Sequence, residues 1–144
     1  MDRREVLVAG VATVVGAVAP AVAREQAKPA TSTSRPLGVH PLAPALEGWQ
    51  GSILEVTYPP GLEGPSHQHP GPTFGYVVRG RIRWAINGQP ATVLEAGQSF
   101  FEPMGSVHST SANASTTEPA VIAVVILGKP GEALSKPATV KPGV

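Results

Sequence analysis

The stretch Gly61–Gly80, GLEGPSHQHPGPTFGYVVRG, decides the fold. His67 and His69 are separated by one residue, and a Pro-Gly-Pro turn and an apolar run follow them. Side chains at positions i and i+2 of an extended strand point to the same face. We therefore expect His67 and His69 to project into one space, as two ligands of a single metal ion must.

A second segment, Gly97–Asn113, GQSFFEPMGSVHSTSAN, supplies His108. Three of the four histidines in the chain thus lie in these two segments, and the fourth, His40, is expected to be an ordinary surface or packing residue. Imidazole binds iron, manganese, nickel, copper and zinc. The sequence therefore predicts one divalent transition metal as cofactor without choosing among these elements.

The pattern around these segments predicts an all-β fold. Short apolar runs are separated by turn signals, of which Asn87-Gly88 is the strongest. The last run, Ala120–Leu127, is continuously apolar and β-branched, which predicts a strand buried on both faces. No segment reads as a good helix, so we expect a small antiparallel barrel or jelly roll. The expected strands are 52–58, 74–78, 81–86, 91–94, 99–101, 107–111 and 120–127.

Composition narrows the function classes. The chain has 144 residues, 42% of them hydrophobic and 15% charged, which suits one globular domain. Its net charge is +1, and the alternating Arg79, Arg81 and Arg83 are expected to form a solvated face and not a nucleic-acid site. There is no cysteine, which excludes disulfides and thiolate ligands. The expected partner is a small molecule, with a homodimer left open.

Residues 1–23 read as an export signal. Arg3 and Arg4 form a basic start, 6–18 an apolar middle, and 21–23 a small-residue cleavage site. The arginine pair resembles a twin-arginine (Tat) signal, although Glu5 departs from that pattern. We expect cleavage after Ala23, a periplasmic or secreted protein, and no stable membrane insertion afterwards. The alternative is an uncleaved anchor, since about 18 apolar residues just span a bilayer.

The remaining domain boundaries follow from the amino-acid composition. Residues 24–45 are rich in Ala, Ser, Thr, Lys and Pro and predict a flexible linker and lead-in. Residues 46–127 hold the expected strands and form the predicted barrel. Residues 128–144 contain three prolines and are expected to be a loose tail.

The two glycine-bounded segments resemble the paired motifs of the cupin superfamily, in the form found in small single-domain, type-2-like bacterial cupins. The resemblance covers roughly 46–127 and implies a small antiparallel β-barrel. The residues in register with the first motif are Gly61, His67, His69 and Gly80, and those in register with the second are Gly97, Pro103, Gly105 and His108, with Asn113 one residue late.

One position departs from the cupin pattern. Thr73 stands where the first motif has a glutamate that usually binds the metal. A neutral hydroxyl is a poor ligand for a divalent transition metal. The resemblance therefore implies a metal held by His67, His69 and His108 alone. Without a carboxylate such an ion keeps its full double charge, which favours an anionic, chelating substrate.

Two functions follow from this resemblance. The first is a metal-dependent enzyme, dioxygenase-like or isomerase-like, acting on a small anionic or enolisable molecule with the metal as Lewis acid. The second is a non-catalytic module that binds or senses a small ligand and has lost the metal-binding glutamate. The candidate pocket-lining residues are Thr73, Phe74, Tyr76, Trp84 and Phe101.

Two glutamates lie close to the motif residues. Glu63 lies in the first segment and Glu102 directly before Pro103 in the second. Either could accept a hydrogen bond from an imidazole N–H. The preferred interpretation is that both are solvated loop carboxylates.

Overall fold

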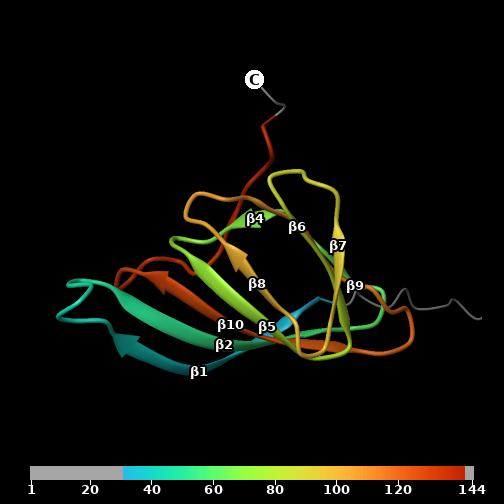
Figure 1. Ribbon diagram of the computed structural model, residues 1–144, viewed down its shortest axis with the longest axis horizontal. Helices are drawn as coiled ribbons and strands as arrows, with labels where there is room; N and C mark the ends of the chain where they lie inside the picture. Colours follow the sequence, from blue (N-terminus) through green and yellow to red (C-terminus); the bar gives the residue numbers. More distant parts are fainter. Residues whose placement is uncertain (1–30, 142–144) are drawn as a thin grey trace, which may run out of the picture.

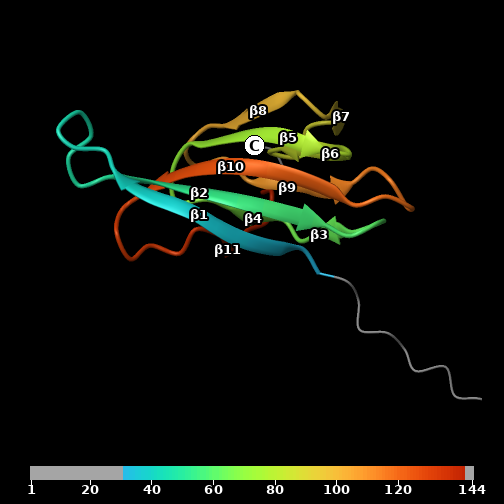
Figure 2. The same cartoon turned by 90° about the horizontal axis from the view of Figure 1, so that it is seen from below.

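The computed structural model describes residues 31–141 as two antiparallel β-sheets packed face to face (Figure 1, Figure 2). One sheet has the strand order β1-β2-β10-β5-β8 and the other β11-β4-β9-β6-β7, with β3 also paired to β9. The described residues form no helix, and accordingly none that could cross a membrane. The architecture is the all-β jelly roll that the sequence predicted.

Eleven strands make up the described part of the chain. They are β1 (Thr33–Pro41), β2 (Gln50–Tyr58), β3 (Glu63–Gly64), β4 (His67–Gln68), β5 (Thr73–Arg79), β6 (Arg81–Ile86), β7 (Thr92–Glu95), β8 (Ser99–Glu102), β9 (His108–Asn113), β10 (Ala120–Gly128) and β11 (Lys136–Pro137).

The core lies between the sheets and is built mainly on β10. This strand is central in the five-stranded sheet, with β2 on one side and β5 on the other. Ile122, Val124 and Ile126 point into the core, while the residues between them are half-buried. Each fully buried aliphatic side chain contributes about 1.5–3 kcal/mol. The other core residues are Leu54, Tyr58, Val77, Ile82, Phe100 and Ala120.

Gly75 leaves room for the ring of Phe100 on the inner face of the sheet. It is the register partner of Phe100 in the β5–β8 pair, and a Cβ at Gly75 would overlap the Phe100 ring. The ring centroid of Phe100 lies 5.6 Å from that of Trp84 and 6.4 Å from that of His108. The missing side chain at Gly75 therefore sets the packing beside the histidines.

The first strand differs from the sequence-based expectation. Residues 33–41 form β1, whereas composition predicted a flexible linker and lead-in over 24–45. β1 pairs along β2 with a bulge between Pro36 and Gly38. β1 is almost entirely exposed, so no alternation of apolar residues signals it. Main-chain hydrogen bonds to β2 hold it instead. The predicted export signal and the cleavage site after Ala23 lie outside the described residues.

The expectation of a loose tail also needs correction. β11 pairs with β4, and Leu134 packs against the core. The chain after β10 therefore returns to the six-stranded sheet at the strand that carries His67 (Figure 2). A ladder of two residues has no recognisable sequence pattern, which is why the tail looked structureless.

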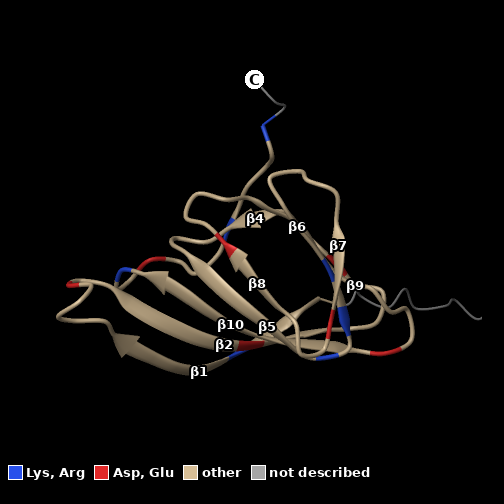
Figure 3. Ribbon diagram, viewed as in Figure 1, with Lys and Arg blue, Asp and Glu red and all other residues tan. Residues whose placement is uncertain are grey.

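Charged residues are scattered along the ribbon and mix both signs (Figure 3). Arg79, Arg81 and Arg83 are exposed, and Arg83 donates to Glu63 at 3.1 Å. All three arginines are solvent-exposed as predicted, but Arg79 ends β5 of one sheet, whereas Arg81 and Arg83 lie in β6 of the other.

Asn113 connects the end of β2 to the loop before β10 through its side-chain amide. Its side-chain amide donates to the carbonyl oxygens of Tyr58, Pro59 and Glu118, and its Oδ1 accepts from the Ser115 N–H. The residue that is one position late in the second motif is therefore structural. It ties the end of β2 to the loop before β10.

Candidate metal centre

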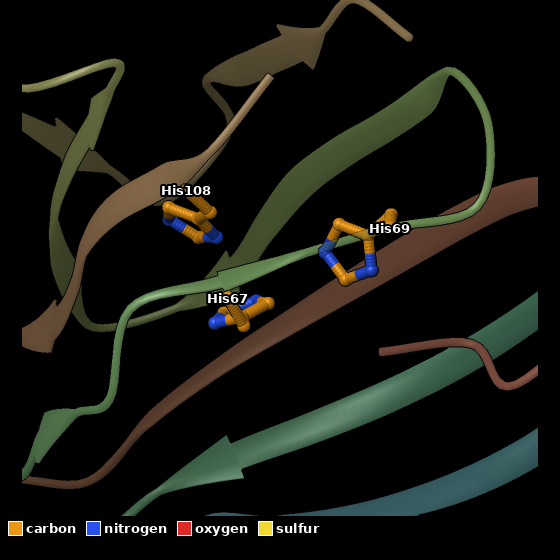
Figure 4. Close-up of side chains that lie close together, drawn as sticks. All are labelled: His67, His69 and His108. Atoms are coloured by element: carbon orange, nitrogen blue, oxygen red, sulfur yellow. The ribbon is translucent and has the colours of Figure 1, made fainter. Parts of the chain in front are cut away.

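The fold brings the three motif histidines together (Figure 4). His67 lies in β4 and is the register partner of His108 in β9, and His69 follows just after β4. One ring nitrogen of each histidine lies within 4.8 Å of one on each of the others. The ring centroid of His67 is 4.9 Å from that of His69 and 4.8 Å from that of His108. The three side chains could hold one metal ion.

Main-chain carbonyls determine which nitrogen is free on two of these rings. His67 Nδ1 lies 2.9 Å from the Pro65 carbonyl oxygen, and His69 Nδ1 lies 2.7 Å from that of Leu134. A carbonyl oxygen only accepts, so each Nδ1 carries the proton and each Nε2 keeps its lone pair. Such outer hydrogen bonds orient imidazole ligands in metal sites. One of the two acceptors comes from the tail.

Of the three histidines, His108 gives the strongest indication of a metal site. It is 3% exposed, and neither ring nitrogen has a hydrogen-bond partner among the described residues. Burial, followed by the proximity of His67 and His69, lowers the pKa of His108 to about 3. Burial also lowers the pKa of His69. Neutral imidazoles with unused lone pairs are the form that binds a metal, so these residues fit a divalent ion.

Glu102 joins this cluster, contrary to the expectation of a solvated loop carboxylate. It is 3% exposed and ends β8, where Phe100 and Glu102 alternate inward. Its Oε1 lies 3.2 Å from His108 Nδ1, and its Oε2 lies 3.7 Å from His69 Nε2. The Trp84 indole N–H donates to Oε1 at 3.4 Å. Burial raises the pKa of Glu102 to about 7, against the opposing effect of the Trp84 hydrogen bond.

The sequence did contain a signal for Glu102. Alternation over residues 99–102 places Phe100 and Glu102 on one face, but the following Pro103 suggested that the strand had already ended. Glu63, by contrast, is exposed and paired with Arg83, as expected for a solvated carboxylate.

A cavity of about 330 Å³ opens beside the cluster. One end is polar and is formed by the three histidines and Glu102. Serines and residues of the tail also border it. The walls are mainly aliphatic and come from β2 and β10: Leu54, Val56, Ile122, Val124 and Ile126.

Tyr58 adds a neutral polar group to the cavity wall. Its hydroxyl is hydrogen-bonded to Ser111 Oγ at 2.8 Å, and both residues line the cavity. Burial raises the pKa of Tyr58 above its ordinary value of 10.0. The phenol therefore stays protonated at neutral pH.

Three of the aromatic residues predicted to line the pocket lie elsewhere. Phe74, Tyr76 and Phe101 are 52%, 49% and 46% exposed and do not border this cavity within residues 31–141. Phe74 and Phe101 contact each other, with ring centroids 4.9 Å apart. The inward positions of β5 are odd-numbered, so residues 74 and 76 point away from the core. The prediction of pocket-lining roles for these three residues is wrong.

The other two residues predicted to line the pocket, Thr73 and Trp84, lie outside the cavity wall but near the metal-site residues. Thr73 is fully buried, donates to the Gly71 carbonyl oxygen at 3.3 Å, and is the register partner of Glu102. Trp84 is half-buried, with its ring centroid 6.4 Å from that of His108. Neither borders the cavity among the described residues. Trp84 contributes instead through its hydrogen bond to Glu102.

The family model described as the cupin domain matches residues 54–126, within the segment predicted to form the barrel. The chain therefore belongs to the cupin domain family. A stretch of 55 residues is 34% identical to dimethylsulfoniopropionate lyase DddQ of Ruegeria pomeroyi, covering 38% of this chain and 27% of the lyase. The matched region thus spans about a quarter of that relative's length.

Solved structures show the same fold. The crystal structure of the Ruegeria pomeroyi lyase aligns with a TM-score of 0.54 and 24% identity, covering 65% of this chain and 45% of the lyase. A cupin-like protein of Thermotoga maritima aligns with a TM-score of 0.57 and 19% identity, covering 76% and 77% of the two chains. An oxalate oxidase in complex with the substrate analogue glycolate aligns with a TM-score of 0.53 and 24% identity, covering 72% and 53%.

Proposed function

We propose that this protein is an exported, metal-dependent cupin enzyme that acts on a small carboxylate. A divalent ion would be held by His67, His69 and His108, and the carboxylate would bind next to it in the 330 Å³ cavity. The observation that carries the proposal is His108, a buried imidazole whose two nitrogens have no hydrogen-bond partner among the described residues. Export rests on the sequence of residues 1–23 alone.

The cavity favours an anionic ligand only when the metal is bound. No lysine or arginine is among the described residues that line it. The ion would therefore supply the positive charge that an anion needs in a pocket whose other groups are aliphatic, neutral and polar, or the acidic Glu102. Dimethylsulfoniopropionate lyase and oxalate oxidase, which resemble this chain, are both named for carboxylate substrates. The chain matches only part of each, so their substrates indicate a class and not an identity.

The side chains suggest how the reaction would be supported. A bound divalent ion supplies Lewis-acid polarisation of a ligand oxygen. The aliphatic walls make the cavity apolar beside the metal site, and the Pro65 and Leu134 carbonyls hold two of the imidazoles in position. The protonated Tyr58 hydroxyl offers a neutral donor at the wall. This set suits lyase-like, isomerase-like or dioxygenase-like chemistry on an enolisable carboxylate.

The second candidate is a cupin that binds or senses a small ligand without converting it. Thr73 at the glutamate position favours it. A non-catalytic module needs no acid or base near the histidines. The buried carboxyl group of Glu102, 3.2 Å from His108, therefore weakens this second candidate.

The first test is the metal content of protein purified without a histidine tag. We expect near-stoichiometric metal in the wild type and almost none in a His67→Ala, His108→Ala double variant. His40→Ala is the matched control, because His40 lies in β1 outside the cluster. A wild type that stays metal-free after reconstitution would rule out the metal-dependent function. Loaded protein incubated with small carboxylates would then separate turnover from binding of a ligand recovered unchanged.

A further inference from the structure

The buried carboxylate of Glu102 lacks an ordinary counter-ion. Among the described residues its ion-pair partners are His69 and His108, and no lysine or arginine lies within ion-pair distance of it. A buried carboxylate without a positive partner is costly, so a group that is not part of the polypeptide is the natural partner here.

The contacts of Glu102 with the two histidines do not have the geometry of hydrogen bonds. The 3.7 Å separation between Oε2 and His69 Nε2 is too long for one, and His108 Nδ1 has no hydrogen-bond partner although Oε1 lies 3.2 Å away. Oxygen and nitrogen ligands lie about 2.0–2.2 Å from a transition metal, so two ligands of one ion are roughly 3.0–3.7 Å apart. Oε1 is thus spaced from His108 Nδ1, and Oε2 from His69 Nε2, as one ligand of a metal ion is from another.

We propose that Glu102 is a fourth ligand of the same metal ion, which makes the centre three histidines and one carboxylate. The assignment rests on the proposed metal-dependent function. It places ligands on both sheets, because Glu102 belongs to β8 of the five-stranded sheet, while His67 and His108 belong to the six-stranded one.

The register explains how the carboxylate reaches this place. Thr73 and Glu102 are directly opposed in the β5–β8 pair, and both are buried. Opposed residues of antiparallel strands share a face, with Cβ atoms about 4.5–5.5 Å apart. A carboxylate at Glu102 therefore enters the space that a glutamate at position 73 would enter, from the neighbouring strand. The Trp84 N–H orients it through Oε1.

The assignment changes the charge expected at the centre. Three neutral imidazoles leave a divalent ion with its full charge, whereas a bound carboxylate reduces the total to a single positive charge. The centre would then match a monoanionic ligand, and it would hold its metal more tightly than imidazoles alone.

Cobalt(II) is the probe, because its visible absorption reports the ligand set without any turnover. We expect Glu102→Gln to change the cobalt spectrum and to weaken cobalt binding by more than about 100-fold, beyond the 10–100-fold typical of a residue that only orients a ligand. Glu63→Gln is the matched control on an exposed glutamate and should leave both unchanged.

If Glu102→Gln fails to fold, a second variant that moves the carboxylate from β8 to β5 still tests the assignment. The double variant Thr73→Glu, Glu102→Thr moves the acid to the opposed position. We expect the cobalt spectrum of this double variant to resemble that of the wild type, and its affinity for cobalt to lie within about 10-fold of the wild-type value.

The two proposals fail in different ways. If cobalt binds to the wild type and Glu102→Gln leaves the spectrum and affinity unchanged, Glu102 is not a ligand, although the three-histidine centre stands. If the wild type binds no cobalt, the metal-dependent function fails and the assignment fails with it.

Discussion

Tyr58 links the core to the cavity through a single hydroxyl group, and its ionisation should be visible in the stability of the protein. Because burial raises its pKa in the folded state above 10.0, the folded chain keeps a proton that the unfolded chain loses. That contribution is complete below pH 10 and is lost as the pH rises above it. We predict that the free energy of unfolding, measured in urea, falls steeply above about pH 10.

Tyr58→Phe tests the origin of this dependence. The variant should lose about 0.5–1.5 kcal/mol at neutral pH with the hydrogen bond to Ser111, and its alkaline decline should be shallower. Tyr76→Phe removes the other tyrosine, on the outer face, and should keep the full decline. Equal alkaline declines in the two variants would contradict the assignment to Tyr58.

At the residue scale the sequence predicted the histidines better than their neighbours. His67, His69 and His108 follow from spacing and from the paired motifs, and the structure brings them together. Glu102 was missed because its orientation depends on where β8 ends. Phe74 was predicted to line the pocket because it is aromatic. In β5, however, the odd-numbered residues point inward, so Phe74 points outward.

Among the elements, the tail has an unexpected influence on the metal centre. The Leu134 carbonyl accepts the His69 Nδ1 proton, and no strand of the barrel supplies this contact. We predict that a chain ending at Glu132 still folds, because its central strands are intact, but binds metal about 10–100-fold more weakly. Isothermal titration with zinc measures this loss. A chain ending at Thr139 keeps Leu134 and β11 and is the control; equal affinity in both would show that the carbonyl has no role.

The elements themselves were predicted where a side-chain pattern exists. The apolar run at 120–127 became β10, and the expected strand at 81–86 has the bounds of β6. β1 and β11 were missed because hydrogen bonds between main chains hold them and none of their side chains is buried. Such edge strands depend on the neighbour they meet, which local composition does not encode.

For the whole molecule, a bound metal would connect the two layers. The histidine ligands come from the six-stranded sheet and from the turn after β4, while Glu102 faces them from the other sheet. A ligand at 100 times its dissociation constant stabilises the folded state by about 2.7 kcal/mol. We therefore predict that a chelator lowers the melting temperature by about 5–15 °C in scanning calorimetry. The His67→Ala, His108→Ala variant should show no such shift; a shift of the same size there would mean that the chelator acts elsewhere.

The bulged first strand has a consequence for self-assembly. β1 and β8 are the outer strands of the five-stranded sheet, and an unpaired outer strand can template the addition of strands from other molecules. β1 contains Pro36 and Pro41, which have no N–H to donate, and its bulge interrupts the regular spacing of the others. Pro103 follows directly after β8. Both outer strands of the sheet are thus poor templates for the addition of strands from other molecules.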